Sequence, residues 1–211
     1  MTSMRNVYLL LAMFTFVSYT ATAQNDPNAK KVLDGVSAKL KTFKGVSALF
    51  NYVSKTRAGK TASNVNGNVL IKDQKYYIKQ GSTEIFSDGN KVWNYNGAGE
   101  VTITPADDAK AITPQKLLTN FYDKDFVYKL ISSAGTFHEI ELTPVDKRKN
   151  FQKVNLFVDK AKMMVTKARI LDKSNNTIEF ALKNINTSAN IPDASFVFNK
   201  SKYKREIEVI E

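Results

Sequence analysis

The sequence contains no cysteine and only one histidine, His138. Without a thiol, the chain has no disulfide framework and no cysteine that could be acylated as a membrane anchor. A single histidine cannot build an imidazole metal cluster or pair with a cysteine nucleophile. The chain also lacks a glycine-rich phosphate loop and a Gly-x-Ser-x-Gly elbow. We therefore expect a protein that is not an enzyme and that uses no cofactor and no metal.

Long apolar runs are absent except at the start of the chain. The run from Val7 to Val17 follows the positively charged Arg5 and precedes Ala21-Thr22-Ala23, a small-x-small cleavage pattern. This arrangement is typical of a secretory signal peptide and is too short for a transmembrane helix. We expect residues 1–23 to be removed and residues 24–211 to form one domain of 211 − 23 = 188 residues. The absence of cysteine and the export signal together predict a soluble protein of the bacterial periplasm.

Acidic side chains are outnumbered, with 20 Asp and Glu against 31 Lys and Arg, which gives a net charge of +11. Such an excess favours acidic partners, among them anionic lipid headgroups and acidic protein surfaces. The lysines are spread along the chain without a dense basic run, and an exported protein does not meet nucleic acid. A basic surface that is simply solvated explains the charge equally well.

One amphipathic helix is predicted at the start of the mature chain. Asp26 is a suitable N-cap, and Pro27 suits the first helical position. Apolar side chains then recur at the spacing of one helical face. They are Ala29, Val32, Leu33, Val36, Leu40 and Phe43. Gly45 is a plausible C-cap, so the predicted helix covers residues 27–44.

From Ala48 onward the pattern has a period of two, which indicates strands separated by short turns. The predicted strands are 49–56, 68–72, 75–80, 83–87, 91–95, 100–104, 126–131, 137–144, 151–159, 163–172, 176–185 and 195–198. Thr113-Pro114 interrupts the series and starts a second helix over residues 114–122. The predicted fold class is mainly β (α+β). We expect a single curled antiparallel sheet of about eleven strands that forms an unclosed β-barrel, with roughly two or three helices as a lid.

Aromatic residues are abundant, with 13 Phe, 9 Tyr and one Trp, Trp93. The stretch FSDGNKVWNYN places an Asp-Gly turn just before Trp93. A tight turn there fixes the register, so Trp93 and Tyr95 share one face while Val92 and Asn94 take the other. That face is either a packed core, which is the usual state of protein interiors, or the wall of an apolar cavity.

The same stretch resembles the Ser-Asp-Gly-x-x-Trp-x-Tyr segment of the LolA family of periplasmic lipoprotein carriers. The order of elements is also similar to that family. A signal peptide and a helix are followed by FNYVSKT, GNVLIKDQKYYIK, the Trp93 hairpin, a PQKLL helix, IELTP and IPDASFVF. The similarity covers residues 28 to about 198. It implies an unclosed β-barrel whose helical lid covers a hydrophobic cavity for lipoprotein acyl chains.

The resemblance also implies site residues. The cavity wall on the sheet would be Phe50, Tyr52, Val69, Ile71, Trp93 and Tyr95. The lid would present Leu33, Val36, Leu40, Leu117, Leu118 and Phe121. The best-known members carry an Arg-Pro pair whose Arg holds the lid. This chain has Asp73-Gln74 at that position, so Lys72 or Lys75 is the candidate latch.

The implied function is a periplasmic carrier that shuttles lipoproteins from the inner to the outer membrane. Its implied partners are acylated lipoproteins, the inner-membrane transporter that releases them and an outer-membrane acceptor, and it would work as a monomer. Two other functions remain compatible with the residues themselves. One is a general binder of lipids or other hydrophobic ligands, and the other is an envelope interaction or sensor module with a filled core.

Overall fold

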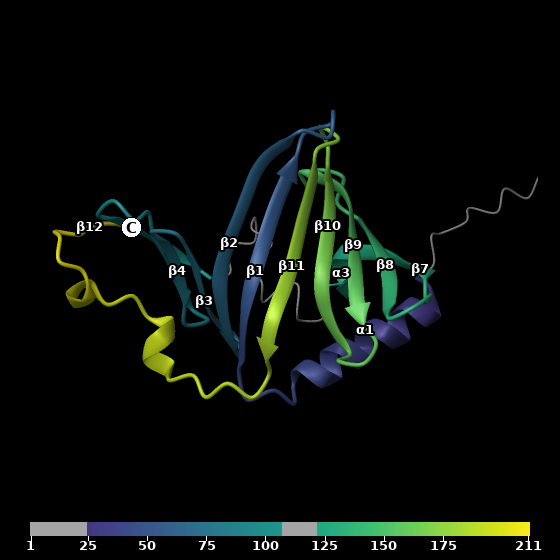
Figure 1. The fold of residues 1–211 in the computed structure, drawn as a ribbon, viewed down its shortest axis with the longest axis horizontal. Coiled ribbons are helices and arrows are strands. Elements are labelled where there is room, and N and C mark those ends of the chain that lie inside the picture. The colour runs from purple at the N-terminus through teal and green to yellow at the C-terminus, as the bar shows by residue number, and fades with distance from the viewer. Residues whose placement is uncertain (1–24, 107–121) are drawn as a thin grey trace, which may run out of the picture.

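A computed structural model describes residues 25–106 and 122–211. Twelve strands form one sheet in the order β12-β6-β5-β4-β3-β2-β1-β11-β10-β9-β8-β7. All neighbours are antiparallel except β12, which runs parallel to β6. The strands are β1 (Val46–Lys55), β2 (Thr61–Lys72), β3 (Lys75–Gln80), β4 (Thr83–Ser87), β5 (Lys91–Tyr95), β6 (Glu100–Pro105), β7 (Phe126–Ser132), β8 (Phe137–Pro144), β9 (Phe151–Asp159), β10 (Met164–Asp172), β11 (Thr177–Asn186) and β12 (Glu208–Ile210). The sheet curls without closing, because β7 and β12 lie at opposite ends of it (Figure 1).

The predicted fold class is confirmed: the chain is mainly β, with one curled, unclosed and almost entirely antiparallel sheet. Besides the strands, the described residues include α1 (Pro27–Leu40), the short helix α3 (Tyr122–Asp125) and the 3₁₀ helices η1 (Asp193–Phe196) and η2 (Lys200–Lys202). The predicted second helix at 114–122 lies almost entirely outside the described residues.

Helix α1 begins where the sequence predicts. The Asp26 side chain accepts hydrogen bonds from the backbone N–H groups of Asn28 (2.8 Å) and Ala29 (3.4 Å), and Pro27 is the first helical residue. The helix ends at Leu40, however, not at residue 44. Gly45 is not its cap, because it forms a β-bridge with Ser188 just before β1 starts. Phe43, the last residue of the predicted apolar stripe, therefore lies in the linker between α1 and β1.

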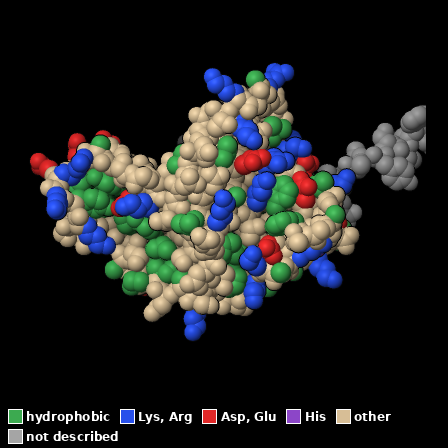
Figure 2. Space-filling view, in the orientation of Figure 1, with side chains coloured by type: hydrophobic (Ala, Val, Ile, Leu, Met, Phe, Trp, Pro, Cys, Tyr) green, Lys and Arg blue, Asp and Glu red, His purple; other side chains and the backbone are tan. Residues whose placement is uncertain are grey.

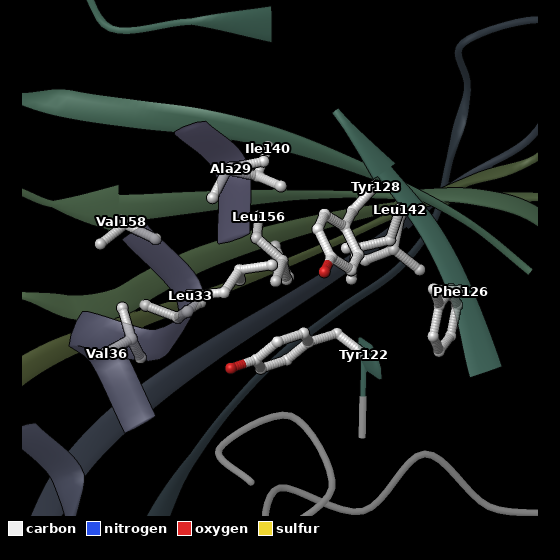
Figure 3. Close-up of a cluster of buried hydrophobic side chains, with 13 residues drawn as sticks. Ala29, Leu33, Val36, Tyr122, Phe126, Tyr128, Ile140, Leu142, Leu156 and Val158 are labelled. Atoms are coloured by element: carbon white, nitrogen blue, oxygen red, sulfur yellow. The ribbon is translucent and has the colours of Figure 1, made fainter. Parts of the chain in front are cut away.

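One face of the sheet, here called the inner face, holds the main core. Ala29, Leu33 and Val36 of α1 pack against it over β7–β10, as Figure 3 shows. The sheet residues of this cluster are Phe126, Tyr128, Ile140, Leu142, Val154, Leu156, Val158, Val165 and Ala168, joined by Tyr122 of α3. Figure 1 shows α1 lying across the lower ends of these strands. The helix thus covers only the half of the inner face that is formed by the later strands.

The opposite face, the outer face, is covered over β3–β6 by the end of the chain. Residues 191–210, here called the strap, pass from η1 through η2 to β12 and follow the left-hand border of the molecule in Figure 1. Phe198, Tyr203 and Ile207 of the strap pack against aromatic side chains of the sheet.

At this end of the chain one strand prediction is wrong, and one strand was not predicted. Residues 195–198 do not form a strand: η1 occupies this region, and it begins directly after Pro192, which has no N–H to donate to a ladder. Strand β12 was not predicted, because its three residues, Glu208–Ile210, have no alternating apolar pattern. Its pairing depends on the parallel register with β6, which is a long-range contact.

Candidate functional site

Four of the predicted wall residues lie together on the inner face. Phe50 pairs with Gly67 and Tyr52 with Val65, while Val69 and Ile71 follow along β2 on the same side. Their exposed fractions are 6% for Phe50, 2% for Val69 and 8% for Ile71, and Tyr52 is partly buried. The Phe50 ring stacks on Phe180 of β11 with 5.5 Å between the ring centroids. These side chains form a second apolar cluster, next to the one that α1 covers.

The other two predicted wall residues, Trp93 and Tyr95, lie on the outer face. The register decides this, because Val69 pairs with Ile78, Ile78 with Ile85, and Ile85 with Asn94. Asn94 and Val92 therefore belong to the inner face, and Trp93 and Tyr95 face the other way. Tyr95 contacts Phe198 and Tyr203 of the strap at ring distances of 6.0 and 4.6 Å. The alternation predicted for this strand is thus present, but it separates Trp93 and Tyr95 from the Phe50 group.

The predicted lid residues of α1 are held in the core. Leu33 and Val36 are 3% and 5% exposed, and Leu40 is partly buried against the same cluster. Asp34 on the same helix accepts hydrogen bonds from Lys30 and from the Tyr122 hydroxyl, and these hold the pKa of its carboxyl below the usual value although burial opposes them. The other predicted lid residues, Leu117, Leu118 and Phe121, lie outside the described residues.

The candidate latch residues Lys72 and Lys75 hold the strap. They flank the two-residue turn Asp73-Gln74, in which Asp73 has a φ of +52°. Both ammonium groups donate to the Asp193 carboxylate at 2.8 Å, and Lys72 also donates to the backbone carbonyl of Ile191 at 3.3 Å. Hydrogen bonds from these two lysines lower the pKa of Asp193 to about 2. Within the described chain these lysines therefore fix the start of η1 on the outer face.

Further inner-face residues were not singled out from the sequence. Ile78, Ile85 and Val92 continue the apolar surface across β3–β5, and Phe180 and Leu182 continue it on β11. All five are only partly buried. The period-two pattern marks each of them as one face of a strand, but strand pairing was needed to show that these faces coincide.

Charge is sorted between the two faces of the sheet. Every lysine and arginine within the twelve described strands occupies an outer-face position. These residues are Lys55, Lys72, Lys75, Lys79, Lys91, Lys129, Lys153, Lys167, Arg169 and Lys183. Figure 2 shows basic side chains scattered over the face of the molecule turned to the viewer. The inner positions of β5 and β6 end the apolar surface with Asn94, Thr102 and Thr104.

Polar groups that are buried near the sheet are paired. On the inner face, burial raises the pKa of Tyr76, although a hydrogen bond with Ser87 acts in the opposite direction. On the outer face, burial acts to raise the pKa of Glu84, but hydrogen bonds from Lys79, Tyr203 and Tyr77 hold it below its usual value. Burial and the neighbouring Glu84 carboxylate raise the pKa of Tyr77 to about 12. These pairings fix side chains in place and supply no group with a pKa near neutrality.

Within residues 25–106 and 122–211 no group of three or more His, Asp and Glu side chains is arranged to hold a metal ion. None of the helices described there has the length and apolar character needed to cross a membrane.

Comparison with known proteins gives one family and several similar folds. The model of the family described as outer membrane lipoprotein carrier protein LolA matches residues 41–199. No curated protein is similar enough in sequence to count as a match.

Among solved structures, an uncharacterized conserved protein from Thermus thermophilus is 13% identical, covers 87% of this chain and 98% of its own, and gives a TM-score of 0.58. A structure of MucB is 13% identical, covers 88% of this chain and 66% of its own, and gives 0.50. A LolA superfamily protein from Nitrosomonas europaea is 13% identical. The match covers 81% of this chain and 97% of that protein, with a TM-score of 0.46.

Proposed function

This chain belongs to the LolA family, and on that premise we propose that it binds the acyl chains of lipoproteins on the inner face and carries them across the periplasm. The family consists of carriers rather than enzymes, so the proposal requires binding and release but no covalent step. Cargo would be loaded from an inner-membrane transporter and passed to an outer-membrane acceptor.

The observation that carries the proposal is the apolar, lysine-free and arginine-free inner face beyond the reach of α1. Ile78, Ile85 and Phe180 are only partly buried there and belong to one apolar cluster. A contiguous apolar patch, unlike a single exposed apolar side chain, indicates a binding surface. Burial of one methylene group is worth about 0.8 kcal/mol, so a lipoprotein with two or three acyl chains cannot cross water uncovered. A preformed apolar surface can cover those chains at no cost in desolvated charge.

Release requires that something replaces the chains. In our proposal Leu117, Leu118 and Phe121, with part of α1, fill the surface when cargo is absent. The net affinity is then the difference between two hydrophobic burials, which is small enough for reversible transfer. Since Leu33 and Val36 are integral to the core around β7–β10, we assign the larger share of this exchange to residues 117–121.

The test is direct binding of a diacylated lipopeptide, a phospholipid and a free fatty acid to the mature protein, measured by native mass spectrometry. We expect a one-to-one complex with the lipopeptide. Ile85→Asn on the inner face should weaken this complex by about tenfold or more through loss of apolar contact. Leu70→Asn, which changes an outer-face position of β2, is the matched control and should leave binding unchanged. Binding of the phospholipid alone would indicate a general lipid carrier. If none of the three ligands binds, the proposed function is wrong.

A further inference from the structure

Among the described residues, β2 has a long strand edge that pairs with no other strand although β2 lies inside the sheet. Residues 61–67 of β2 pair with β1 on one side, but pairing with β3 on the other side starts only at Asn68. Strand β3 ends at Gln80, and the chain turns back at Gly81, which has a φ of +59°. Within the described chain, the backbone groups of residues 61–67 that point away from β1 therefore have no strand partner.

The two ends of the sheet are protected, in contrast to this edge. At β7, the side chains of Asn25 and Asp26 accept hydrogen bonds from the N–H groups of Tyr128 (3.1 Å) and Leu130 (3.0 Å). At the other end, β12 has only three residues. Proteins usually shield an open edge with charge, proline or a covering segment, because an open edge is a template for another strand. The sequence TASNVNG at 61–67 contains neither charge nor proline.

A pocket of about 480 Å³ lies beside this edge on the outer face. Figure 2 shows the outline of the molecule stepping inward between the upper half of β2 and the lobe formed by β3–β6. The pocket is lined by Leu49, Phe50, Asn51, Asn66, Gly67, Asn68, Lys79, Gly81 and Lys183. Lys79 is paired with Glu84 at 2.7 Å, whereas Lys183 has no ion-pair partner among the described residues. The pocket therefore combines an open strand edge with an uncompensated positive charge.

The pocket is separated from the inner face by very little protein. Gly67 has no side chain, and the Phe50 ring, which stacks on Phe180 on the inner face, lies against it. A ligand whose apolar end lies on the inner face beside Phe50 would therefore have its other end close to the free edge of β2 and to this pocket. In an acylated polypeptide, the residues directly after the lipid-bearing end are the part that would take this path.

We propose that the free edge of β2 at residues 61–67 binds the peptide segment next to the acylated end of the cargo as an added strand, and that Lys183 favours acidic side chains in it. Main-chain hydrogen bonds give such strand addition its affinity, and the flanking side chains give it its preference. This inference rests on the proposed function, because it assumes that the lipid part of the same molecule is bound on the inner face.

The experiment compares three probes with identical acyl chains on the mature full-length protein. The first is diacylglyceryl-cysteine methyl ester without a peptide, the second continues as Ser-Asp-Glu-Asp-Gly, and the third continues as Ser-Lys-Lys-Lys-Gly. We expect the acidic probe to bind about tenfold more tightly than the peptide-free lipid, from several edge hydrogen bonds and one charge contact. The acidic probe alone should also slow amide hydrogen exchange at residues 61–67.

Lys183→Glu should cancel the preference for the acidic probe and leave the affinity for the peptide-free lipid unchanged. The matched control is Lys129→Glu, an exposed outer-face lysine on β7. Equal binding of all three probes would overturn the strand-addition site while leaving the carrier function intact, and failure of all three to bind would refute the carrier function itself. If Lys183→Glu and Lys129→Glu weaken binding of the acidic probe equally, the preference for that probe arises from the net charge of the protein, and the proposed site is overturned. Protection of residues 61–67 that depends on protein concentration, without a probe, would assign the edge to a second copy of the chain.

Discussion

Gly67 illustrates how one residue shapes the sheet. A Cβ atom added there would lie 2.3 Å from the carbonyl oxygen of Lys79 and 2.4 Å from Cζ of Phe50. No flexible side-chain end is available to relieve the first contact, because it involves backbone. Only glycine therefore allows β2 to leave β3 at this point while Phe50 covers the gap.

We predict that Gly67→Ala destabilises the protein by about 1–3 kcal/mol, the usual range for overpacking. Urea unfolding followed by circular dichroism measures this. Gly35→Ala is the control. Gly35 lies in the middle of α1, and a Cβ added there would meet the Met163 side chain at 3.5 Å, an ordinary van der Waals distance. Alanine has the higher helix propensity, so Gly35→Ala should raise stability by about 0.5–1 kcal/mol. A neutral Gly67→Ala would show that β2 does not need this close approach.

Asp193 gives the second prediction at the residue scale. The folded-state pKa is about 2, below the value of about 3.9 for an unperturbed aspartate. A depressed folded pKa contributes stability that is present above the unfolded pKa and is lost as pH falls through the folded pKa. The stability difference between the wild type and Asp193→Asn should therefore be constant from pH 7 to about pH 4 and vanish towards pH 2. Thermal unfolding at a series of pH values tests this, and a difference that persists at pH 2 would contradict it.

At the scale of elements, the strap is the least local part of the fold. It is joined to β2 and β3 through Asp193, to β4 through the hydrogen bond from Tyr203 to Glu84, and to β6 through β12. None of these partners is near it in sequence. The strap turns the outer face of β3–β6 into a second core, which explains why Tyr95 and Phe86 are 5% and 6% exposed there.

We predict that Phe198→Ala weakens this core. The Phe198 ring contacts those of Phe86, Tyr95 and Tyr203 at centroid distances of 5.8, 6.0 and 5.1 Å. Its loss should cost about 2–3 kcal/mol and shift the emission of Trp93 to longer wavelength as water reaches the outer face. The neighbouring Val197 is 41% exposed, so Val197→Ala is the control and should change neither quantity. An unchanged Trp93 spectrum in Phe198→Ala would mean that the strap does not shield that side chain.

Much of the element structure could be predicted from the sequence, because it depends on local signals. The Asp26-Pro27 helix start, the Asp88-Gly89 turn and the period-two strands are examples. Which face of each strand joins which face of the next could not be predicted, since it depends on register between strands. This is why Trp93 and Phe50, each correctly read as one face of a strand, lie on opposite sides of the sheet. The strap was missed for the same reason, because its contacts are long-range.

At the scale of the whole molecule, the sheet separates two environments. The inner face is mainly apolar and carries no lysine or arginine of the described strands, and the outer face carries the basic residues of the strands and the aromatic core beneath the strap. The basic side chains of the strands therefore lie where they can meet acidic partners or membranes without entering the apolar surface. In the proposed carrier function, the cargo contacts can therefore change without a change in the surface presented to other proteins.

This separation predicts which probe will report on cargo. Because Trp93 lies under the strap, its emission should stay unchanged when a diacylated lipopeptide binds to the inner face. Replacing Phe180 with tryptophan, in a Trp93→Phe background, places the probe beside Phe50, and its emission should move to shorter wavelength on binding because acyl chains displace water. Titration of both proteins with the same lipopeptide makes the comparison, and Phe198→Ala shows that Trp93 can respond when its own surroundings change. A response of Trp93 with none from the Phe180→Trp variant would place the ligand on the outer face and reverse the assignment of the two surfaces.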